Sequence, residues 1–246
     1  MKKKILILFC CCCLFISDKI QARAVGTFYN FNLQYNSAQV PSNTFVIQNF
    51  ILNWNASNGK ITIAHQLNPG KIIWQNITNK GFCGAAQGNE TITESRGSFR
   101  IVDVKTNITQ TQTISSINLS NNQLEIKGQF LSGINTNYIL TISQKSDNQL
   151  HFNLQTDDNN FNRLYLSYAC DNNEQFFGCG EQPSNLNHKG KRVPILVQEQ
   201  GIGRGDDLTN NAIVNGIVNL TLGSSVGDEY TSYKVVPQYI SSKSNA

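Results

Sequence analysis

Beyond its first 24 residues, the sequence lacks a net excess of charge of either sign. The whole chain of 246 residues has a formal net charge of +4. All of that excess belongs to residues 1–24, whose charged side chains are Lys2, Lys3, Lys4, Lys19, Arg23 and Asp18. Attraction to nucleic acid or to an acidic membrane requires an excess of Lys and Arg. The sequence therefore predicts no nucleic-acid partner and, once residues 1–24 are removed, no membrane partner.

Cysteine is also scarce outside the N-terminal segment. Four of the seven cysteines lie at positions 10–13, which leaves Cys83, Cys170 and Cys179. Three cysteines allow at most one internal disulfide, and we hypothesise a bridge between Cys170 and Cys179, which flank the polar turn "DNNEQ". Cys170, Cys179 and His188 are spaced nine residues apart, far wider than zinc ligand pairs. The sequence predicts no metal site and no cofactor.

The chain also lacks any window of a dozen residues with a helical stripe of apolar side chains. Instead, polar and apolar residues alternate with a period of two, as in "FYNFNLQY" (residues 28–35), which is typical of half-buried strands. Turn signals such as "SNGK", "NPGK" and "KSDNQ" separate many of these runs. The alternation predicts strands at residues 28–35, 44–54, 60–65, 98–104, 123–130, 138–144, 149–156, 162–168, 212–222 and 231–239.

Short strands at this spacing predict an all-β fold, an antiparallel sandwich or barrel. One such domain can occupy two hundred or so residues, and no linker or internal repeat interrupts the sequence. We therefore expect a single β domain over residues 25–246.

The N-terminus has the pattern of a secretory signal peptide. "MKKK" is a positive region, "ILILFCCCCLFI" is a short apolar core, and "QARA" offers small residues for cleavage after Ala24. The apolar run is short for a membrane span, although an uncleaved anchor is the alternative. We expect export of residues 25–246, either as a secreted protein or into the lumen of the secretory or endolysosomal pathway.

Six sequons of the form Asn-x-Ser/Thr are candidate glycosylation sites in an exported chain. The sequence is so rich in Asn, Ser and Thr that composition alone gives roughly five, so their number does not argue for export. The six asparagines are Asn55, Asn76, Asn89, Asn107, Asn118 and Asn219.

One segment differs from the rest of the chain. Residues 176–205, "FFGCGEQPSNLNHKGKRVPILVQEQGIGRG", concentrate glycines and two Glu-Gln pairs at the ends of apolar runs. Gly178 and Gly180 indicate a tight backbone approach or a positive φ that brings Glu181 and Gln182 to a bend. A carboxylate and an amide placed there suit a hydroxylated ligand, and the alternative is an ordinary hairpin cap.

The same segment resembles the N-terminal domain of glycoside hydrolase family 31, the α-glucosidase family. It is most similar to the sulfoquinovosidase-like branch, where a run "YGxGEQ…GKxxPxxxxEQGxGR" is typical. "GFCGAAQGNETITESRGSFRIVDV" (residues 81–104) and "YKVVPQYISSK" (residues 233–243) also resemble segments of this family, in the family's order. This sequence departs from the pattern at Cys179, between the two glycines, and in "PSNLNHK".

The resemblance implies a galactose-mutarotase-like β-sandwich, incomplete at its C-terminus. It also implies that the catalytic aspartates belong to a following (β/α)8 barrel, so this chain has no catalytic residue and is expected to be inactive alone. By the motifs, the residues at the mouth of the sugar pocket are Glu181, Gln182, Glu199, Gln200 and Arg204.

Two functional hypotheses follow. The first is a non-catalytic sandwich domain of an exported α-glycosidase, whose partners are the barrel and, through the whole enzyme, an α-glycoside. The second is an extracellular carbohydrate-binding or adhesion sandwich that works without a barrel.

Overall fold

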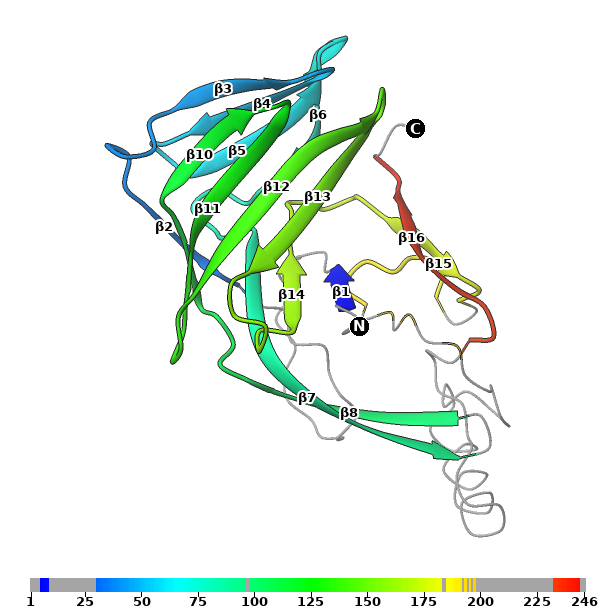
Figure 1. Ribbon diagram of the computed structural model, residues 1–246. Helices are drawn as coiled ribbons and strands as arrows, with labels where there is room; N and C mark the ends of the chain where they lie inside the picture. The colour runs from blue at the N-terminus through cyan, green and yellow to red at the C-terminus, as the bar shows by residue number, and fades with distance from the viewer. Residues whose placement is uncertain are drawn as a thin grey trace. The chain divides into compact units, whose positions relative to one another are not determined.

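A computed structural model shows a chain built from β-strands (Figure 1). The structure describes residues 5–8, 30–95, 98–182, 185–191, 193, 195, 197 and 232–243, and these residues contain no helix. In chain order the strands are β1 (Ile5–Leu8), β2 (Asn32–Tyr35), β3 (Asn43–Ile47), β4 (Phe50–Asn55), β5 (Lys60–His65), β6 (Asn68–Gln75), β7 (Cys83–Ser95), β8 (Ser98–Thr106), β9 (Thr111–Ile114), β10 (Ser116–Ser120), β11 (Gln123–Leu131), β12 (Thr136–Ser146), β13 (Gln149–Thr156), β14 (Arg163–Leu166), β15 (Phe176–Gly180) and β16 (Val235–Ser241). The prediction of an all-β fold is confirmed.

The described strands form four sheets. One has the order β3-β4-β5-β6, and another has the order β13-β12-β11-β9-β2 with β10 also paired to β11. The other two are β1-β14-β7-β8 and the pair β15-β16. Most neighbours are antiparallel, while β2 runs parallel to β9 and β1 runs parallel to β14.

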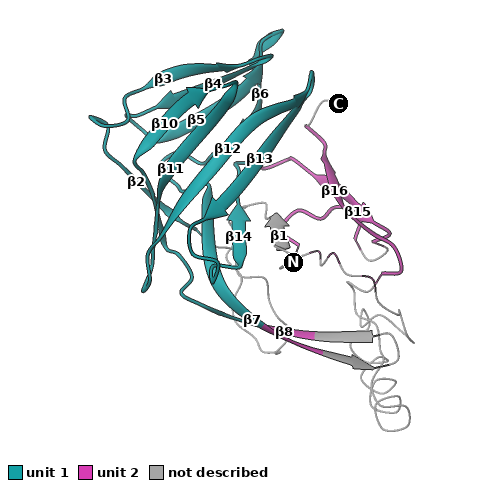
Figure 2. Cartoon of the chain, in the orientation of Figure 1, with its two compact units in different colours: residues 1–13, 27–89, 104–170 teal, residues 14–26, 90–103, 171–246 magenta. Residues whose placement is uncertain are grey.

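The chain divides into two compact units, shown in separate colours in Figure 2. Unit 1 comprises residues 1–13, 27–89 and 104–170, and unit 2 comprises residues 14–26, 90–103 and 171–246. The β3–β6 sheet and the sheet of β9 to β13 with β2 both belong to unit 1. The pair β15-β16 belongs to unit 2.

The core of unit 1 lies between its two larger sheets, as the period-two pattern requires. In β11 the side chains at alternate positions are buried, and β12 repeats this pattern on the neighbouring strand. The facing sheet contributes the buried side chains of β4 and β5 in the same alternating way. The largest fully buried side chains are Trp54, Tyr138, Phe50, Phe82, Phe130 and Phe161. Side chains from both sheets fill one hydrophobic cluster, which is the packing of a β-sandwich.

A buried amide connects the strands of this core. The Gln112 side chain is fully buried, and its Oε1 accepts hydrogen bonds from the backbone N–H groups of Phe82 (2.9 Å) and Cys83 (3.2 Å). Its Nε2 donates to the Tyr138 hydroxyl (2.8 Å), which donates in turn to the Thr113 carbonyl oxygen (2.8 Å). Each polar atom of the amide thus has a partner, as a buried amide requires.

Several predicted boundaries were wrong. The run predicted as one strand over residues 44–54 is two strands, β3 and β4, because Gln48 takes a positive φ of 50° and turns the chain. The "NPGK" predicted as a turn is the start of β6. Proline cannot donate to a ladder, and Pro69 is tolerated because β6 is the edge strand of its sheet. The predicted strand at 212–222 lies outside the described residues.

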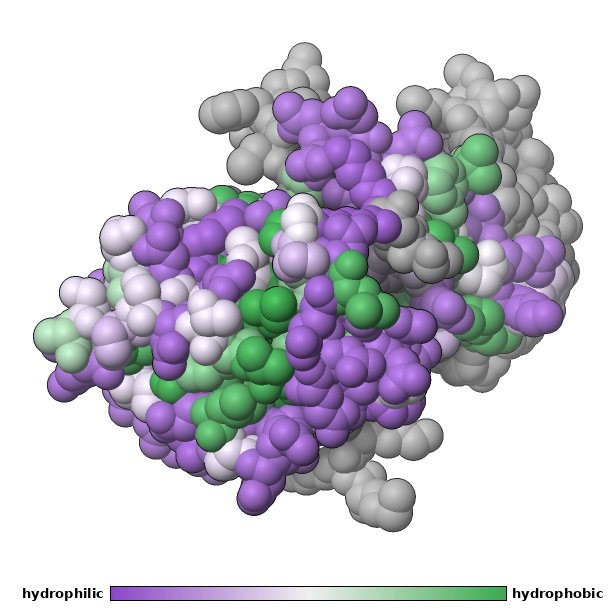
Figure 3. All heavy atoms as spheres, turned by 90° about the horizontal axis from the view of Figure 1, so that it is seen from above, coloured by the Kyte–Doolittle hydropathy of each residue, from purple (hydrophilic) through white to green (hydrophobic). Residues whose placement is uncertain are grey.

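Unit 1 also exposes apolar side chains. Leu67 is 90% exposed and Ile73 of β6 is 49% exposed, and Val46 of β3 and Ile72 of β6 are exposed as well. In the view from above, apolar residues form a contiguous patch bordered by polar ones (Figure 3). A contiguous apolar patch on a soluble domain commonly marks a surface that another protein segment covers.

Candidate functional site

Two of the five candidate binding residues are described by the structure. Glu181 and Gln182 directly follow β15. Glu199, Gln200 and Arg204 lie outside the described residues. The geometry of the site is therefore that of the bend at the end of β15.

Three consecutive residues with positive φ make this bend. The φ angles are 111° at Gly178, 62° at Cys179 and 85° at Gly180. In the antiparallel pairing with β16, Gly178 lies opposite Tyr239 while Gly180 lies opposite Val235, so the register shifts between the two glycines. Positive φ is readily adopted by glycine and is costly for a residue with a side chain. Cys179 therefore holds a backbone conformation that its two neighbours and β16 impose.

The two glycines also lie too close to β16 to carry a side chain. A Cβ on Gly178 would lie 2.8 Å from the Gln238 carbonyl oxygen, and one on Gly180 would lie 2.5 Å from the Lys234 carbonyl oxygen. These neighbours are backbone atoms, which cannot rotate away. The prediction that these glycines serve close approach and positive φ is confirmed.

The backbone of Glu181 is fixed on both sides. Its N–H donates to the Lys234 carbonyl oxygen (2.7 Å), and its carbonyl oxygen accepts from the Ser232 hydroxyl. Ser232 is fully buried, and its Oγ also accepts from the Lys234 N–H (3.2 Å). Glu181 itself is exposed, and its carboxylate has no hydrogen-bond or ion-pair partner among the described residues. The bend thus exposes a carboxylate that has no partner among the described residues, on a backbone held by hydrogen bonds.

Gln182 has a different role from that of its neighbour. Its Nε2 donates to the Cys179 carbonyl oxygen (3.1 Å), so the amide closes the bend back on itself. His188 lies close to the same turn. Its ring Nε2 is 3.2 Å from the Gly178 carbonyl oxygen, and its backbone N–H donates to the Phe176 carbonyl oxygen (2.8 Å). The roles of Ser232 and His188 were not predicted, because neither residue belongs to a motif that identifies its partner.

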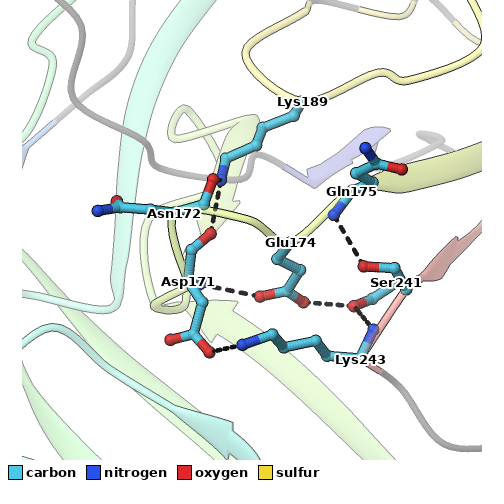
Figure 4. A network of polar contacts seen from close by, with 8 residues as sticks. Asp171, Asn172, Glu174, Gln175, Lys189, Ser241 and Lys243 are labelled. Atoms are coloured by element: carbon cyan, nitrogen blue, oxygen red, sulfur yellow. Dashed lines mark hydrogen bonds and ion pairs between the residues drawn. The ribbon is translucent and has the colours of Figure 1, made fainter.

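A polar network closes the other end of the strand pair (Figure 4). The Asp171 carboxylate pairs with the Lys243 ammonium, which holds the pKa of Asp171 below its ordinary value. The Glu174 carboxylate accepts from the Asp171 N–H (3.0 Å) and from the Ser241 hydroxyl. Lys189 donates to the backbone carbonyl oxygen of Asp171 (2.5 Å). These carboxylates are occupied by structural partners, which distinguishes them from Glu181.

The structure has no disulfide between Cys170 and Cys179, contrary to the prediction. The reason lies in the pairing of the strands. β15 pairs with β16, while the segment before the "DNNEQ" turn is held by a bond from the Ala169 N–H to the Gln75 carbonyl oxygen (2.8 Å). No hairpin therefore sets the two cysteines opposite each other. Burial raises the pKa of the Cys179 thiol, which keeps it protonated at neutral pH.

The sequons fall in contrasting environments. Asn55, Asn89 and Asn118 are exposed, Asn107 is half-buried and Asn76 is buried. Asn219 lies outside the described residues.

Two further properties of the described residues bear on function. They contain no group of three His, Cys, Asp or Glu side chains that could hold a metal ion. None of them forms a helix with the length and apolar character needed to cross a membrane.

The described bend carries one carboxylate, that of Glu181. Glycoside hydrolysis uses two carboxyl groups about 5–10 Å apart across the scissile bond. Within residues 176–182 and 185–191, Glu181 is the sole carboxylate. An exposed carboxylate of this kind can accept hydrogen bonds from hydroxyl groups or pair with a cation.

Comparison with known proteins supports the resemblance found in the sequence. The family model of the glycosyl hydrolase 31 N-terminal galactose mutarotase-like domain matches residues 29–213. The sulfoquinovosidase of Escherichia coli (strain K12) is 37% identical over 75 residues, which cover 30% of this chain and 11% of that protein. The sulfoquinovosidase of Agrobacterium fabrum (strain C58) is 33% identical over 89 residues, which cover 36% of this chain and 13% of that protein.

A solved structure has the same fold. It is a family 31 sulfoquinovosidase from E. rectale in complex with the aza-sugar inhibitor IFGSQ, with a TM-score of 0.58 and 21% sequence identity. The match covers 82% of this chain and 26% of the solved chain. The chain thus spans about a quarter of that enzyme's length and a smaller share of the two curated relatives.

Proposed function

Because the chain belongs to the glycosyl hydrolase 31 N-terminal galactose mutarotase-like family, we propose that it serves as the non-catalytic sandwich domain of a larger glycoside hydrolase. The whole enzyme would hydrolyse O-glycosyl bonds in carbohydrate metabolism, with its catalytic carboxylates outside this chain. The lone carboxylate of the described bend supports this division of labour, since hydrolysis requires two.

The role that we propose for the bend is to shape the sugar entrance. The observation that carries this role is the Glu181 carboxylate, which is exposed and has no partner among the described residues, although the backbone on both sides of it is fixed. A ligand that bonds to a constrained side chain requires less ordering on binding. Glu181 would accept hydrogen bonds from sugar hydroxyl groups or orient a neighbouring cation.

The substrate class that we propose is an α-glycoside. Sulfoquinovosides are the first class to test, because the relatives bear the name sulfoquinovosidase. Glu181 would not contact the sulfonate of such a sugar, since two anions repel. The sulfonate would require a cation, and among the candidate residues only Arg204 supplies one.

The domain would also pack against a catalytic barrel. The exposed apolar side chains of unit 1, Leu67 and Ile73 among them, are consistent with a surface that a further domain covers. We also propose that the chain is exported after cleavage behind Ala24, on the basis of the N-terminal pattern.

One observation favours the alternative, a sandwich that binds carbohydrate without a barrel. A pocket of about 220 Å³ lies between β3 and β10, with Val40, Phe45 and Ile117 in its lining. Its polar lining includes Gln39, whose amide has no hydrogen-bond partner among the described residues. An amide beside an apolar floor suits a sugar ring, which has polar edges and apolar faces.

Two measurements separate these functions. Titration of this chain with methyl α-glucoside and with an alkyl α-sulfoquinovoside tests binding without a barrel. Kinetics of a Glu181 variant in an enzyme that joins this domain to a barrel test the first proposal. Saturable binding by the chain alone that is lost in Gln39→Ala supports the alternative.

A further inference from the structure

The amide of Asn76 is a structural part of unit 1 although it belongs to the sequon "NIT". Its Oδ1 accepts from the Ile61 N–H (2.7 Å), and its Nδ2 donates to the carbonyl oxygens of Gly59 (2.9 Å) and Lys80 (3.1 Å). The residue is 1% exposed. These three bonds connect the start of β5 to the loop that follows β6.

An N-linked glycan on Asn76 is incompatible with these contacts. An amide nitrogen carries two hydrogens, and both are used in the fold. Attachment of a sugar replaces one of them, so either the Gly59 or the Lys80 carbonyl oxygen would lose its donor. The sugar would also need space around an atom that is buried, and a packed interior has no such space.

At three other sequons the asparagine is exposed and its amide hydrogens are not used in the fold of the described residues. Asn55, Asn89 and Asn118 are exposed, and their Nδ2 atoms donate no hydrogen bond to the described residues. At Asn55, the carboxamide oxygen alone is engaged, by the Ser57 N–H (2.9 Å) and hydroxyl (2.6 Å). Asn107 is intermediate between buried Asn76 and the three exposed asparagines. It is half-buried, and its Nδ2 donates one hydrogen bond, to Gln87 Oε1 (2.7 Å).

We propose that Asn55, Asn89 and Asn118 are N-glycosylation sites of the folded chain and that Asn76 must stay unmodified for unit 1 to fold. The inference rests on the proposed export, since the chain must meet the enzyme that attaches glycans. Attachment precedes folding, so the Asn76 sequon competes with folding. A glycan there would trap the chain outside its native structure.

The chain offers variants that separate the sequon from the amide. Thr78 is exposed and completes the Asn76 sequon, so Thr78→Ala abolishes modification while keeping every Asn76 contact. Asn76→Gln abolishes modification too, but its longer side chain cannot keep the three bonds. Ser120→Ala removes the sequon of Asn118 and is the matched control at an exposed site.

The test is translation of the full chain, residues 1–246, in a cell-free system with and without endoplasmic-reticulum microsomes. Mass spectrometry locates the glycans, and limited proteolysis separates folded chains from unfolded ones. We expect the resistant chains to carry glycans at Asn55, Asn89 and Asn118 and none at Asn76. We also expect Thr78→Ala to raise the resistant fraction in the presence of microsomes and to leave it unchanged in their absence.

Asn76→Gln should lose the resistant fraction under both conditions, which identifies the amide itself as the structural element. Resistant chains with a glycan on Asn76 would overturn the proposal, and so would the absence of glycans from the three exposed sites in chains that have been imported into the microsomes. Neither readout depends on sugar hydrolysis, so failure of the enzymatic role and failure of this inference are distinguishable.

Discussion

Gly180 of β15 and Lys234 near the start of β16 approach so closely that a Cβ on Gly180 would lie 2.5 Å from the Lys234 carbonyl oxygen. The next residue, Glu181, donates its N–H to that same oxygen (2.7 Å). One carbonyl group therefore limits the size of residue 180 and fixes the position of residue 181. The bend and the exposed carboxylate are consequences of the same contact.

Gly180→Ala should destabilise unit 2 through two effects, a positive φ and a clash with backbone atoms. Alanine at a positive φ costs more than about 1 kcal/mol, and the clash adds to this cost. Gly190 is the matched control, because its φ is 70° and a Cβ there meets nothing within 4 Å. Proteolysis between residues 171 and 190 should speed up in Gly180→Ala by more than in Gly190→Ala. Equal effects would show that the approach to Lys234 is not the constraint.

Asp157→Asn should reduce the dependence of stability on pH. The Asp157 carboxylate accepts from the Thr136 hydroxyl (2.7 Å) and the Asn137 N–H (2.9 Å), and these bonds lower its pKa. A lowered folded pKa stabilises the fold above the ordinary Asp value, near 4, and this contribution is lost as pH falls through the folded pKa. Denaturant unfolding between pH 7 and pH 2.5 should show a steeper acid loss in the wild type than in the variant.

The control for that measurement is Asp147→Asn, because the Asp147 carboxylate makes no hydrogen bond to the described residues. This variant removes a carboxylate without removing a side-chain hydrogen bond. A profile for Asp157→Asn that superimposes on the wild type would contradict the assigned hydrogen bonds.

Cleavage behind Ala24 should open one edge of a sheet. β14 has β7 on one side and β1 on the other, with Leu6 paired to Leu164 and Leu8 to Leu166. Loss of β1 leaves β14 with an unpaired edge, and such edges invite association. Hydrogen exchange over residues 163–166 should be faster in the chain lacking residues 1–24, while exchange in β12 should be unchanged.

N-terminal sequencing of exported material tests the cleavage itself. Material that begins at Met1 would contradict the proposed signal peptide. Equal exchange in β14 with and without residues 1–24 would show that β1 does not protect that edge.

The parts of the fold that the sequence predicted are those set by local pattern. Alternation of apolar residues identified β11, β12 and β13, because one face of each strand packs on the core. Alternation failed at β6, where "NPGK" has the residues of a turn and the edge position of the strand permits them. It also missed β9 and β10, which are short strands without a long apolar run.

At the candidate site too, the local sequence predicted the backbone conformation but not the distant residues that the bend contacts. The glycines on both sides of Cys179 predicted a close approach and positive φ, since glycine has no other strong reason to recur there. The residues that they approach, Gln238 and Lys234, are distant in sequence, and nothing in the local pattern could identify them. The buried hydroxyl of Ser232 was unpredictable for the same reason.

Glu181→Gln should weaken sugar recognition without abolishing hydrolysis, in an enzyme that joins this domain to its barrel. A hydrogen bond to a charged group is worth on the order of 1.5–3 kcal/mol, so its loss should lower kcat/KM roughly ten- to a hundredfold. Glutamine keeps the size and backbone contacts of residue 181, so the change removes only the charge. Glu125→Gln on β11, whose carboxylate pairs with Lys127 (2.8 Å), controls for the loss of one negative charge. Kinetics on aryl α-glucoside and aryl α-sulfoquinovoside substrates give both the size of the effect and the preferred class. No change in kcat/KM would show that the bend is an ordinary hairpin cap without a role in sugar recognition. Complete loss of turnover with folding intact would place a catalytic group in this domain.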